Sequence, residues 1–360
     1  MKFSRREFFK KAGAATALAG IAACARKLAE PIEIPVGNKK LKIVFQFGKH
    51  ETAVDARQLE PVLRDFKPHV VSVEWWGVDK DAESFEKRIY SPLFNPDEEF
   101  AVSDFSREQH RLLKQYRPRI FVLERMVKEA IDNYVNWTAE GTIHAYAAIG
   151  AMSMGDAQGV IDEYRQYLMA ETKSNALREA QIKSALSDLH DSLTLRYPEL
   201  AREKEIRIAV QYGSAHTPIY EHARRVGFGS VGRKMLTPAY YPATSAFVRR
   251  ATFGKPQDYS DAEVARTFTA DMLLQYAKQL GTNDNNSAAF GNLFAKKIGF
   301  DKFHRIFASV AAEPWQEKGF FDPRIWQAAF AKHGVKLPAS KEEVHAFLEK
   351  RIGRRRLAPD

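Results

Sequence analysis

Two short apolar runs rich in β-branched residues constrain the fold of this chain more than any other feature. The first, residues 42–47, ends in a Gly-Lys-His turn, and the second, residues 70–73, ends at Glu74. Buried parallel strands show mostly apolar runs of this kind because helices cover both of their faces. Residues 52–66, which lie between the two runs, place apolar side chains at helical spacing. Together these segments predict a strand–helix–strand unit.

A third run of the same kind occurs in the second half of the chain. Residues 206–212 are apolar at most positions and are followed by Gly213 and, three residues later, by His216. Parallel strands deliver their carboxyl ends to one edge of a sheet, so residues far apart in the sequence meet there. We therefore expect His50, Glu74 and His216 to lie within coordination reach of one another.

The strands are separated by long helical patterns, which predicts an α/β fold with a parallel or mixed central sheet and flanking helices. We expect residues 41–360 to form one domain. A helical insertion at about 80–200 is expected to cover the strand ends, and a helical part follows at about 255–353. A further short strand is expected at or before residues 246–248. Spacing and capping signals predict helices at 52–66, just after Ser106, and at 119–135, 145–154, 160–197, 261–280 and 340–353.

Composition narrows the class of protein. The chain of 360 residues is 45% apolar, which is enough for a large core. Its formal charge is +10, but five basic residues and one acidic residue lie in the first 23 positions, which leaves +6 for the rest. A moderately basic surface is typical of a solvated face and also suits anionic lipid or acidic ligands, and no pattern supports nucleic-acid binding. The single cysteine, Cys24, excludes an internal disulfide and a cysteine-based zinc site.

The N-terminus has the layout of an export signal. A basic stretch containing Arg5 and Arg6 precedes a run of small apolar residues that is too short to span a membrane permanently. The paired arginines resemble a twin-arginine signal, and the four residues ending at Cys24 resemble a bacterial lipobox, in which the cysteine is lipidated. An ordinary signal peptide with an incidental cysteine is the alternative. We assign residues 1–23 to the signal peptide and 24–40 to a lipid-anchor tether.

These features predict a location and two partners. We expect the twin-arginine machinery to export the chain and membrane lipid to hold it through Cys24. The protein would then lie on the periplasmic or extracytoplasmic side of the bacterial cell envelope.

Histidine and carboxylate side chains at strand ends are ligand types of zinc, manganese and iron sites. The candidate metal ligands are His50, Glu74 and His216, and an open coordination position would activate water. Gly48 and Gly213 permit tight turns or a close backbone approach just before the two histidines. A purely structural role for both turns is the alternative, since such glycine–histidine spacings also occur by chance.

Four short motifs together resemble the Tiki/TraB superfamily, which includes ChaN-like haem-binding lipoproteins and erythromycin-esterase-like hydrolases. They are the Phe-Gly-Lys-His turn at 47–50, the strand ending at Glu74, the Asn-Ala-Leu-Arg-Glu segment around Arg178 and the Tyr-Gly-Ser-Ala-His turn at 212–216. The resemblance covers about residues 41–230 discontinuously. It implies an α/β core with helical cover and, in the Tiki branch, metal-dependent peptide hydrolysis. The catalytic residues so implied are His50, Glu74, Arg178 and His216.

The resemblance implies two classes of bound group. The hydrolase branch uses a divalent metal, which would be manganese, zinc or iron. The ChaN-like branch binds haem, which the lipoprotein signal favours, and an anionic propionate suits Lys49. The residues expected to contact the bound group are Gly48, Lys49, Gly213 and Trp75, although Trp75 as a cap on the core is the alternative.

The expected function is therefore that of an extracytoplasmic Tiki/ChaN-like lipoprotein that hydrolyses a peptide-like substrate with a metal. A haem-binding or iron-uptake lipoprotein is one alternative. A non-catalytic lipoprotein that binds an envelope partner is the other. A second Gly-Thr-Ile-His sequence at 141–144 spells the family turn more literally, but it does not follow a β-branched run, and a helix start is predicted there.

Overall fold

A computed structural model describes most of the chain in two compact units. Unit 1 consists of Met1–Trp75, Asp79–Leu123 and Leu186–Leu236, and unit 2 of Trp76–Val78, Glu124–Ala185 and Thr237–Asp360. Within these units the structure describes residues 32–36, 39–48, 53–74, 79–98, 103–124, 128–213, 216–225, 233–235, 240–253, 255, 257–313 and 322–353. The single-domain expectation for 41–360 stays a prediction.

Unit 1 is an α/β unit. Its strands are β1 (Ile32–Val36), β2 (Lys39–Gly48), β3 (Val70–Val73), β4 (Arg119–Phe121), β5 (Glu205–Gly213) and β6 (Arg233–Met235). Its helical segments are α2 (Ala53–Arg57), α3 (Leu59–Pro61), η1 (Val62–Phe66), α4 (Asp79–Ile89), η2 (Pro96–Glu98), α5 (Asp104–Tyr116), α8 (Leu189–Arg196), η3 (Pro198–Arg202) and α9 (Thr217–Arg225).

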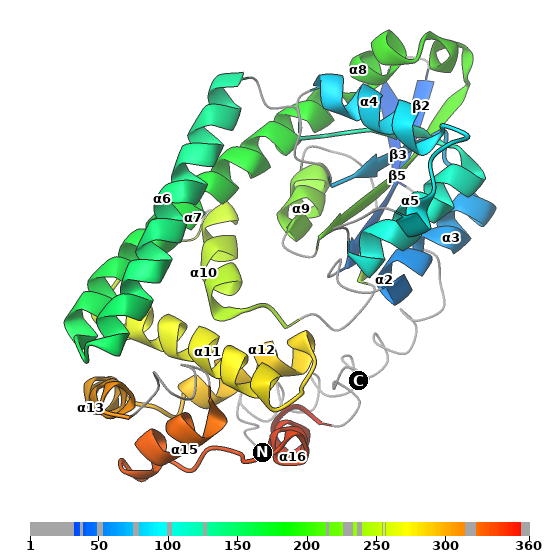
Figure 1. The fold of residues 1–360 in the computed structure, drawn as a ribbon. Coiled ribbons are helices and arrows are strands. Elements are labelled where there is room, and N and C mark those ends of the chain that lie inside the picture. The colour runs from blue at the N-terminus through cyan, green and yellow to red at the C-terminus, as the bar shows by residue number, and fades with distance from the viewer. Residues whose placement is uncertain are drawn as a thin grey trace, which may run out of the picture. The chain divides into compact units, whose positions relative to one another are not determined.

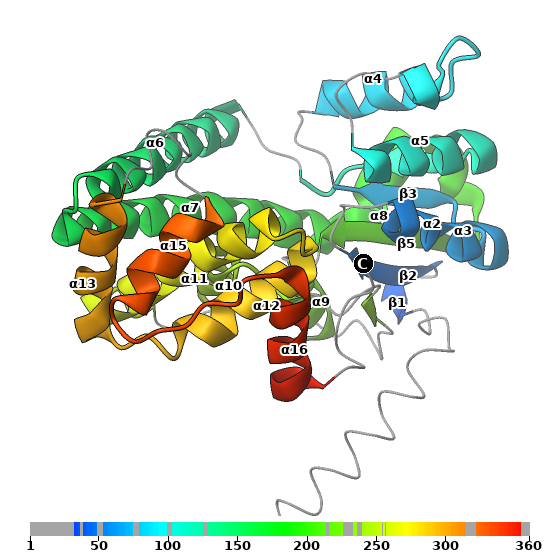
Figure 2. The ribbon, with the colours of Figure 1, turned by 60° about the horizontal axis from the view of Figure 1, so that its bottom comes forward.

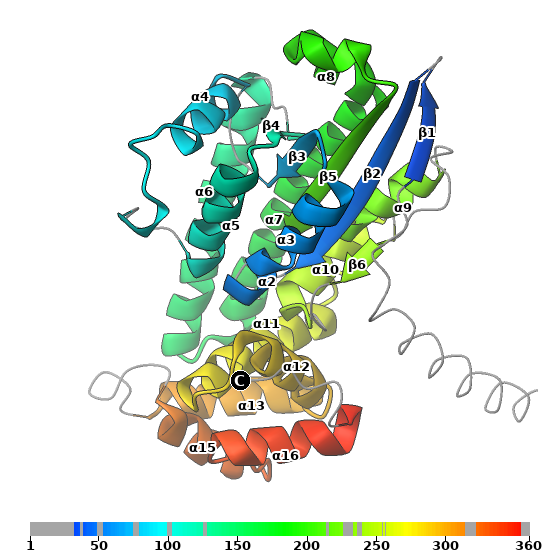
Figure 3. The same ribbon diagram turned by 90° about the vertical axis from the view of Figure 1, so that its right-hand side faces the viewer.

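The sheet is mixed, with the order β1-β2-β5-β3-β4 and β6 beside β2 (Figure 3). Strands β2, β5, β3 and β4 run parallel, while β1 is antiparallel to β2. The α/β prediction with a parallel or mixed sheet is therefore confirmed. Strand β5 lies between β2 and β3, so the two strands of the predicted strand–helix–strand unit are not direct neighbours.

Helices cover both faces of this sheet, which is why its strands carry apolar residues on both sides. On one face, Leu63 of η1, Phe85 of α4 and Leu113 of α5 form a buried cluster with Val71 of β3. Helices α2, α3 and α5 lie on that side in Figure 3. On the other face, the ring of Tyr220 in α9 packs edge-on against Phe45 of β2 at 6.1 Å.

Two sequence assignments in unit 1 were wrong. Residues 119–135 were predicted as one helix, but Arg119–Phe121 is strand β4 and the helix begins only at Lys128. Pairing with β3 outweighs the local spacing of apolar residues, because a short apolar run fits either period. Residues 24–40 were predicted as a tether, yet Ile32–Val36 pairs with β2 as a strand. The alternation Ile-Glu-Ile-Pro-Val has the period of a strand, and its proline suits an edge.

Capping residues account for several helix starts. The cap of α5 is Ser103, which accepts a hydrogen bond from Ser106 N, so the helix starts earlier than Ser106 predicted. Ser340 caps α16 as predicted. The strand expected at or before 246–248 is β6 at 233–235, and residues 246–248 themselves lie in a helix.

Unit 2 is helical (Figures 1 and 2). Its helices are α6 (Lys128–Ser153), α7 (Ala157–Ser187, whose last two residues fall in unit 1), α10 (Ala243–Thr252), α11 (Asp261–Gln279), α12 (Asp284–Ala295), α13 (Phe300–Ala311), α15 (Pro323–Ala331) and α16 (Lys341–Ile352). Phe268 of α11, Phe307 of α13 and Trp326 of α15 lie in one buried cluster. Among the described residues, no helix combines the length and the apolar content that crossing a bilayer requires.

Gly291 sets how closely α11 and α12 approach. A Cβ at this position would lie 2.2 Å from the carbonyl oxygen of Ala270, which is backbone and cannot rotate away. We predict that Gly291→Ala lowers the free energy of unfolding by about 3 kcal/mol, the upper range of an overpacked core.

The matched control is Gly150→Ala in α6, where a Cβ meets nothing within 4 Å. That change should raise the free energy of unfolding by about 0.5–1 kcal/mol, because alanine favours a helix. Urea unfolding followed by circular dichroism measures both. Equal effects of the two substitutions would contradict the close packing of α11 on α12.

Candidate functional site

Three neighbouring parallel strands end in acidic or imidazole side chains. Glu74 directly follows β3, His216 lies three residues after β5, and Glu124 lies three residues after β4. The sheet order places β5, β3 and β4 side by side. The segment Asp79–Leu123 of unit 1 ends just before Glu124. Each of the three residues offers a possible ligand atom, and these atoms lie within 4.8 Å of one another.

The Glu74 carboxylate is fixed by two contacts within unit 1. Its Oε2 accepts a hydrogen bond from the backbone N–H of Gly213 at 2.7 Å, and its Oε1 lies 3.1 Å from His216 Nε2. A Cβ on residue 213 would stand 2.9 Å from Glu74 Oε2. Glycine at this position lets the Glu74 carboxylate approach the end of β5, and a side chain there would make the carboxylate shift.

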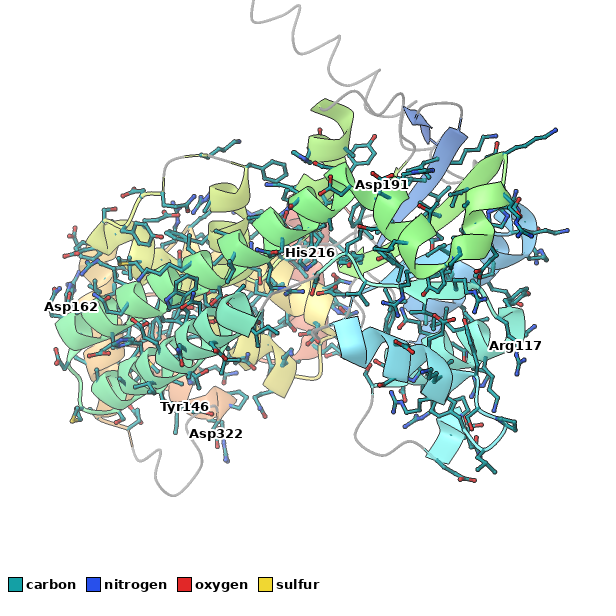
Figure 4. All side chains as sticks on the ribbon, turned by 90° about the horizontal axis from the view of Figure 1, so that it is seen from above. Arg117, Tyr146, Asp162, Asp191, His216 and Asp322 are labelled. Atoms are coloured by element: carbon teal, nitrogen blue, oxygen red, sulfur yellow. The ribbon has the colours of Figure 1, made fainter. Side chains whose placement is uncertain are left out.

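His216 is almost completely buried, with 1% of its surface exposed. It lies just before α9, and its ring meets Tyr212 edge-on at 5.5 Å. Figure 4 labels this side chain. Because an ionised carboxylate only accepts hydrogen bonds, the contact with Glu74 places a proton on Nε2. A cation that binds here has to displace that proton.

Glu124 is also buried, with 1% exposure, and its Oε1 accepts a hydrogen bond from Arg178 at 2.8 Å. Arg178 lies on α7, and 9% of its side chain is exposed. A carboxylate at this depth needs a cation or hydrogen bonds to stay ionised. Arg178 supplies both to Glu124.

The structure thus brings together Glu74 and His216, two of the three predicted metal ligands. Gly213 contacts Glu74 as described, and Gly48 ends β2 opposite Gly213 in the strand register. The contact described for Arg178 is with Glu124, which is not one of the predicted ligands. The other predicted site residues, which are Cys24, Lys49, His50 and Trp75, lie outside the described residues.

Sequence reasoning missed Glu124. The segment Arg-Ile-Phe-Val-Leu-Glu at 119–124 has the same form as the run that ends at Glu74, an apolar strand followed by a carboxylate. Its assignment to a helix concealed this signal. The second Gly-Thr-Ile-His sequence lies within α6 rather than at a helix start, and there His144 Nδ1 is 2.7 Å from Glu163 Oε2.

The donor set fits a divalent metal ion. Two carboxylates and one imidazole combine hard and borderline ligands, which suit manganese, iron and zinc. Metal–ligand bonds of about 2.0–2.2 Å place ligand atoms roughly 3–4.4 Å apart, so a small closure of the 4.8 Å cluster is sufficient. The cluster of Glu74, Glu124 and His216 can therefore hold a metal ion, and its geometry does not select one.

Comparisons of this chain with protein-family models, with curated proteins and with solved structures find no match. The resemblance to the Tiki/TraB superfamily stays a prediction from the four motifs.

We predict that Arg178→Met lowers the free energy of unfolding by about 3–5 kcal/mol, because it removes the cation beside the buried Glu124 carboxylate. The double variant Arg178→Met/Glu124→Gln should recover part of this loss, since no buried charge then needs the cation. Urea unfolding at neutral pH measures both.

The control is Arg324→Met, which breaks an ion pair with Asp322 on a side chain that is 76% exposed. Exposed pairs contribute little, so this change should stay within about 0.5–1 kcal/mol of the parent. If Arg178→Met behaved like Arg324→Met, the Glu124–Arg178 pair would not stabilise the buried carboxylate.

Proposed function

We propose that this protein is a metal-dependent hydrolase of the cell envelope, with Glu74, Glu124 and His216 as metal ligands and a peptide-like substrate. The cluster of two carboxylates and one buried imidazole at three adjacent strand ends is the observation that carries the proposal. The carboxyl edge of a parallel sheet is where α/β proteins bind ligands. The four motifs shared with the Tiki/TraB superfamily support the same reaction class.

Each residue has a distinct role in this proposal. The backbone N–H of Gly213 orients the Glu74 carboxylate, and Arg178 orients that of Glu124. Burial of His216 excludes bulk water from its ring and strengthens electrostatic interactions there. A bound divalent ion would supply Lewis acidity and a water of lowered pKa.

The contact between Glu74 and His216 also supports a second candidate, a hydrolase in which His216 acts as a general base without metal. A carboxylate that is itself anchored fixes the orientation of an imidazole and stabilises its protonated form. The Glu74 carboxylate is anchored in this way by Gly213. The two candidates share their residues and differ in whether activity depends on a metal.

Metal titration tests the leading candidate. We predict that Mn²⁺ or Zn²⁺ binds with one site per chain in calorimetry, and that Glu124→Gln and Glu74→Gln each weaken binding at least about tenfold, since each removes an anionic ligand. Binding should weaken as the pH falls, because protons compete for the same ligand atoms. The control His144→Gln breaks a histidine–glutamate contact between α6 and α7 and should change nothing.

Release of new amino termini from a peptide mixture, with and without a chelator, separates the candidates. Activity that is lost on chelation and restored by metal supports the metal-dependent hydrolase. Activity that survives chelation but is lost in His216→Gln supports the metal-free one. Absence of both metal binding and hydrolysis would contradict the two together. In that case, an absorption band of haem in protein purified from its own envelope would support the haem-binding lipoprotein. Co-purification of an envelope partner would support the non-catalytic lipoprotein.

We also propose that the chain is a lipoprotein exported through the twin-arginine route. The support is the sequence alone, because residues 1–31 lie outside the described part of the structure. Cys24→Ser should release the protein from the membrane fraction, since it removes the residue that would be lipidated. Replacing Arg5 and Arg6 with lysine should leave precursor in the cytoplasm. Membrane fractionation and immunoblotting measure both effects, and a Cys24→Ser protein that stays with membranes would refute the anchor.

A further inference from the structure

Unit 2 contains a trough, and none of the residues that line it belongs to the metal cluster. It has a volume of about 330 Å³ and is formed by one face each of α10, α11 and α12 together with the residues before α10. Its lining combines tyrosines, cations and small side chains. The lining residues are Tyr240, Tyr241, Ala243, Ala246, Arg250, Glu263, Arg266, Thr267, Ala270, Asn292 and Lys296.

The packing of the three helices gives the trough two different ends. Helices α10 and α11 are antiparallel, because Arg250 near the end of α10 pairs with Glu263 at the start of α11, while Ala243 N donates to Asp271 further along α11. Helices α11 and α12 are antiparallel as well, with Gly291 packed on Ala270. Arg250 near the end of α10 and Arg266 near the start of α11 both pair with Glu263, Lys296 directly follows α12, and Tyr240 and Tyr241 precede the start of α10.

The cationic end is held in place by Glu263. Its carboxylate accepts a hydrogen bond from Arg250 at 2.8 Å and also pairs with Arg266, while only 9% of its side chain is exposed. The sequence predicts a capping box here, in which Glu263 would bond the backbone of Ser260. Ser260 caps α11 as predicted, since its hydroxyl accepts from Glu263 N, but Ser260 N donates to Asp258 and the Glu263 carboxylate pairs with the arginines. Three cations and one carboxylate leave a net charge of about +2 at neutral pH.

Two contacts hold the tyrosine segment before α10. The guanidinium of Arg249 lies 4.6 Å from the centre of the Tyr241 ring. The side-chain amide of Asn292 donates to the carbonyl oxygens of Tyr241, at 2.6 Å, and Ala288, at 3.0 Å. Both N–H groups of Asn292 are thereby used, so its side-chain oxygen is the atom that can accept from a ligand hydroxyl.

The half-buried carboxylate of Asp271 fixes the start of α10, which carries Ala243 of the trough. Asp271 accepts hydrogen bonds from Ala243 N at 2.8 Å, from Thr244 N at 3.2 Å and from the Tyr164 hydroxyl at 2.6 Å. The walls of the trough are therefore set before a ligand arrives. A preformed site loses little conformational entropy on binding.

We propose that this trough binds a phosphorylated sugar, with the phosphate at the cations and the sugar ring between the tyrosines and the alanine floor. Paired guanidinium groups recognise phosphate oxygens through directed hydrogen bonds. Tyrosine offers an apolar face for a ring and a hydroxyl for hydrogen bonding. The volume is at the small end of ligand pockets, which suits a monosaccharide phosphate rather than a dinucleotide. A free sugar phosphate and the phosphorylated sugar headgroup of a lipid share this chemistry.

Calorimetric titration with glucose 1-phosphate, glucose 6-phosphate and N-acetylglucosamine 1-phosphate, each against its unphosphorylated sugar, tests the proposal. At least one phosphate is expected to bind more than tenfold tighter than its sugar and tighter than inorganic phosphate. Arg266→Gln should weaken that binding at least tenfold, and Tyr241→Leu should remove the preference over inorganic phosphate. The control Arg324→Gln changes an exposed arginine of the same unit and should leave binding intact.

Lys296→Gln guards against loss of folding, since Lys296 is exposed and its change should weaken binding about threefold to tenfold while the unfolding curve stays unchanged. Co-sedimentation with phosphatidylcholine vesicles that contain 5% phosphatidylinositol 4-phosphate distinguishes the sources. Vesicle binding that requires Arg266 and Lys296 identifies a lipid headgroup, and binding of soluble phosphates alone identifies a free sugar phosphate. Failure of both, or binding that ignores both substitutions, overturns the proposal.

Discussion

The backbone ladder of β5 is the interaction on which unit 1 depends. This strand begins 84 residues after β4 ends and pairs in parallel with β2 on one side and β3 on the other. In the described sheet β2 and β3 are not hydrogen-bonded to each other, so β5 is the strand that joins them. Such non-local pairing costs loop-closure entropy, which burial of both faces of the strands must offset.

The same ladder creates the candidate site. Because β5 lies beside β3, the backbone N–H of Gly213 reaches the carboxylate of Glu74, and His216 follows within contact distance. Because β4 lies on the far side of β3, Glu124 joins them. The chemistry therefore comes from strand order, and the three residues are separated by 50 and 92 positions in the sequence.

Unit 2 uses carboxylates in a different way. Asp271 fixes the start of α10, and Glu263 holds two arginines at the edge of a trough. Burial raises the pKa of the Asp271 carboxyl, while the hydrogen bonds from Thr244, Tyr164 and Ala243 oppose that rise. Close packing of α12 on α11, permitted by Gly291, completes the frame. Helix–helix contacts and a few charged side chains thus shape a ligand-sized space without strands.

The sequence by itself determined the fold class, the strands β2, β3 and β5 and the placement of Glu74 and His216 at strand ends, because long apolar runs with abrupt polar endings are local signals. It did not determine β4, the pairing of Ile32–Val36 or the role of Glu124, because short segments take the structure that their neighbours impose. It also did not determine that the Glu263 carboxylate pairs with two arginines, because Glu263 fits a capping pattern as well. Only tertiary structure decided these, since which strand lies next to which, and which carboxylate meets which cation, are set by contacts between residues far apart in the chain.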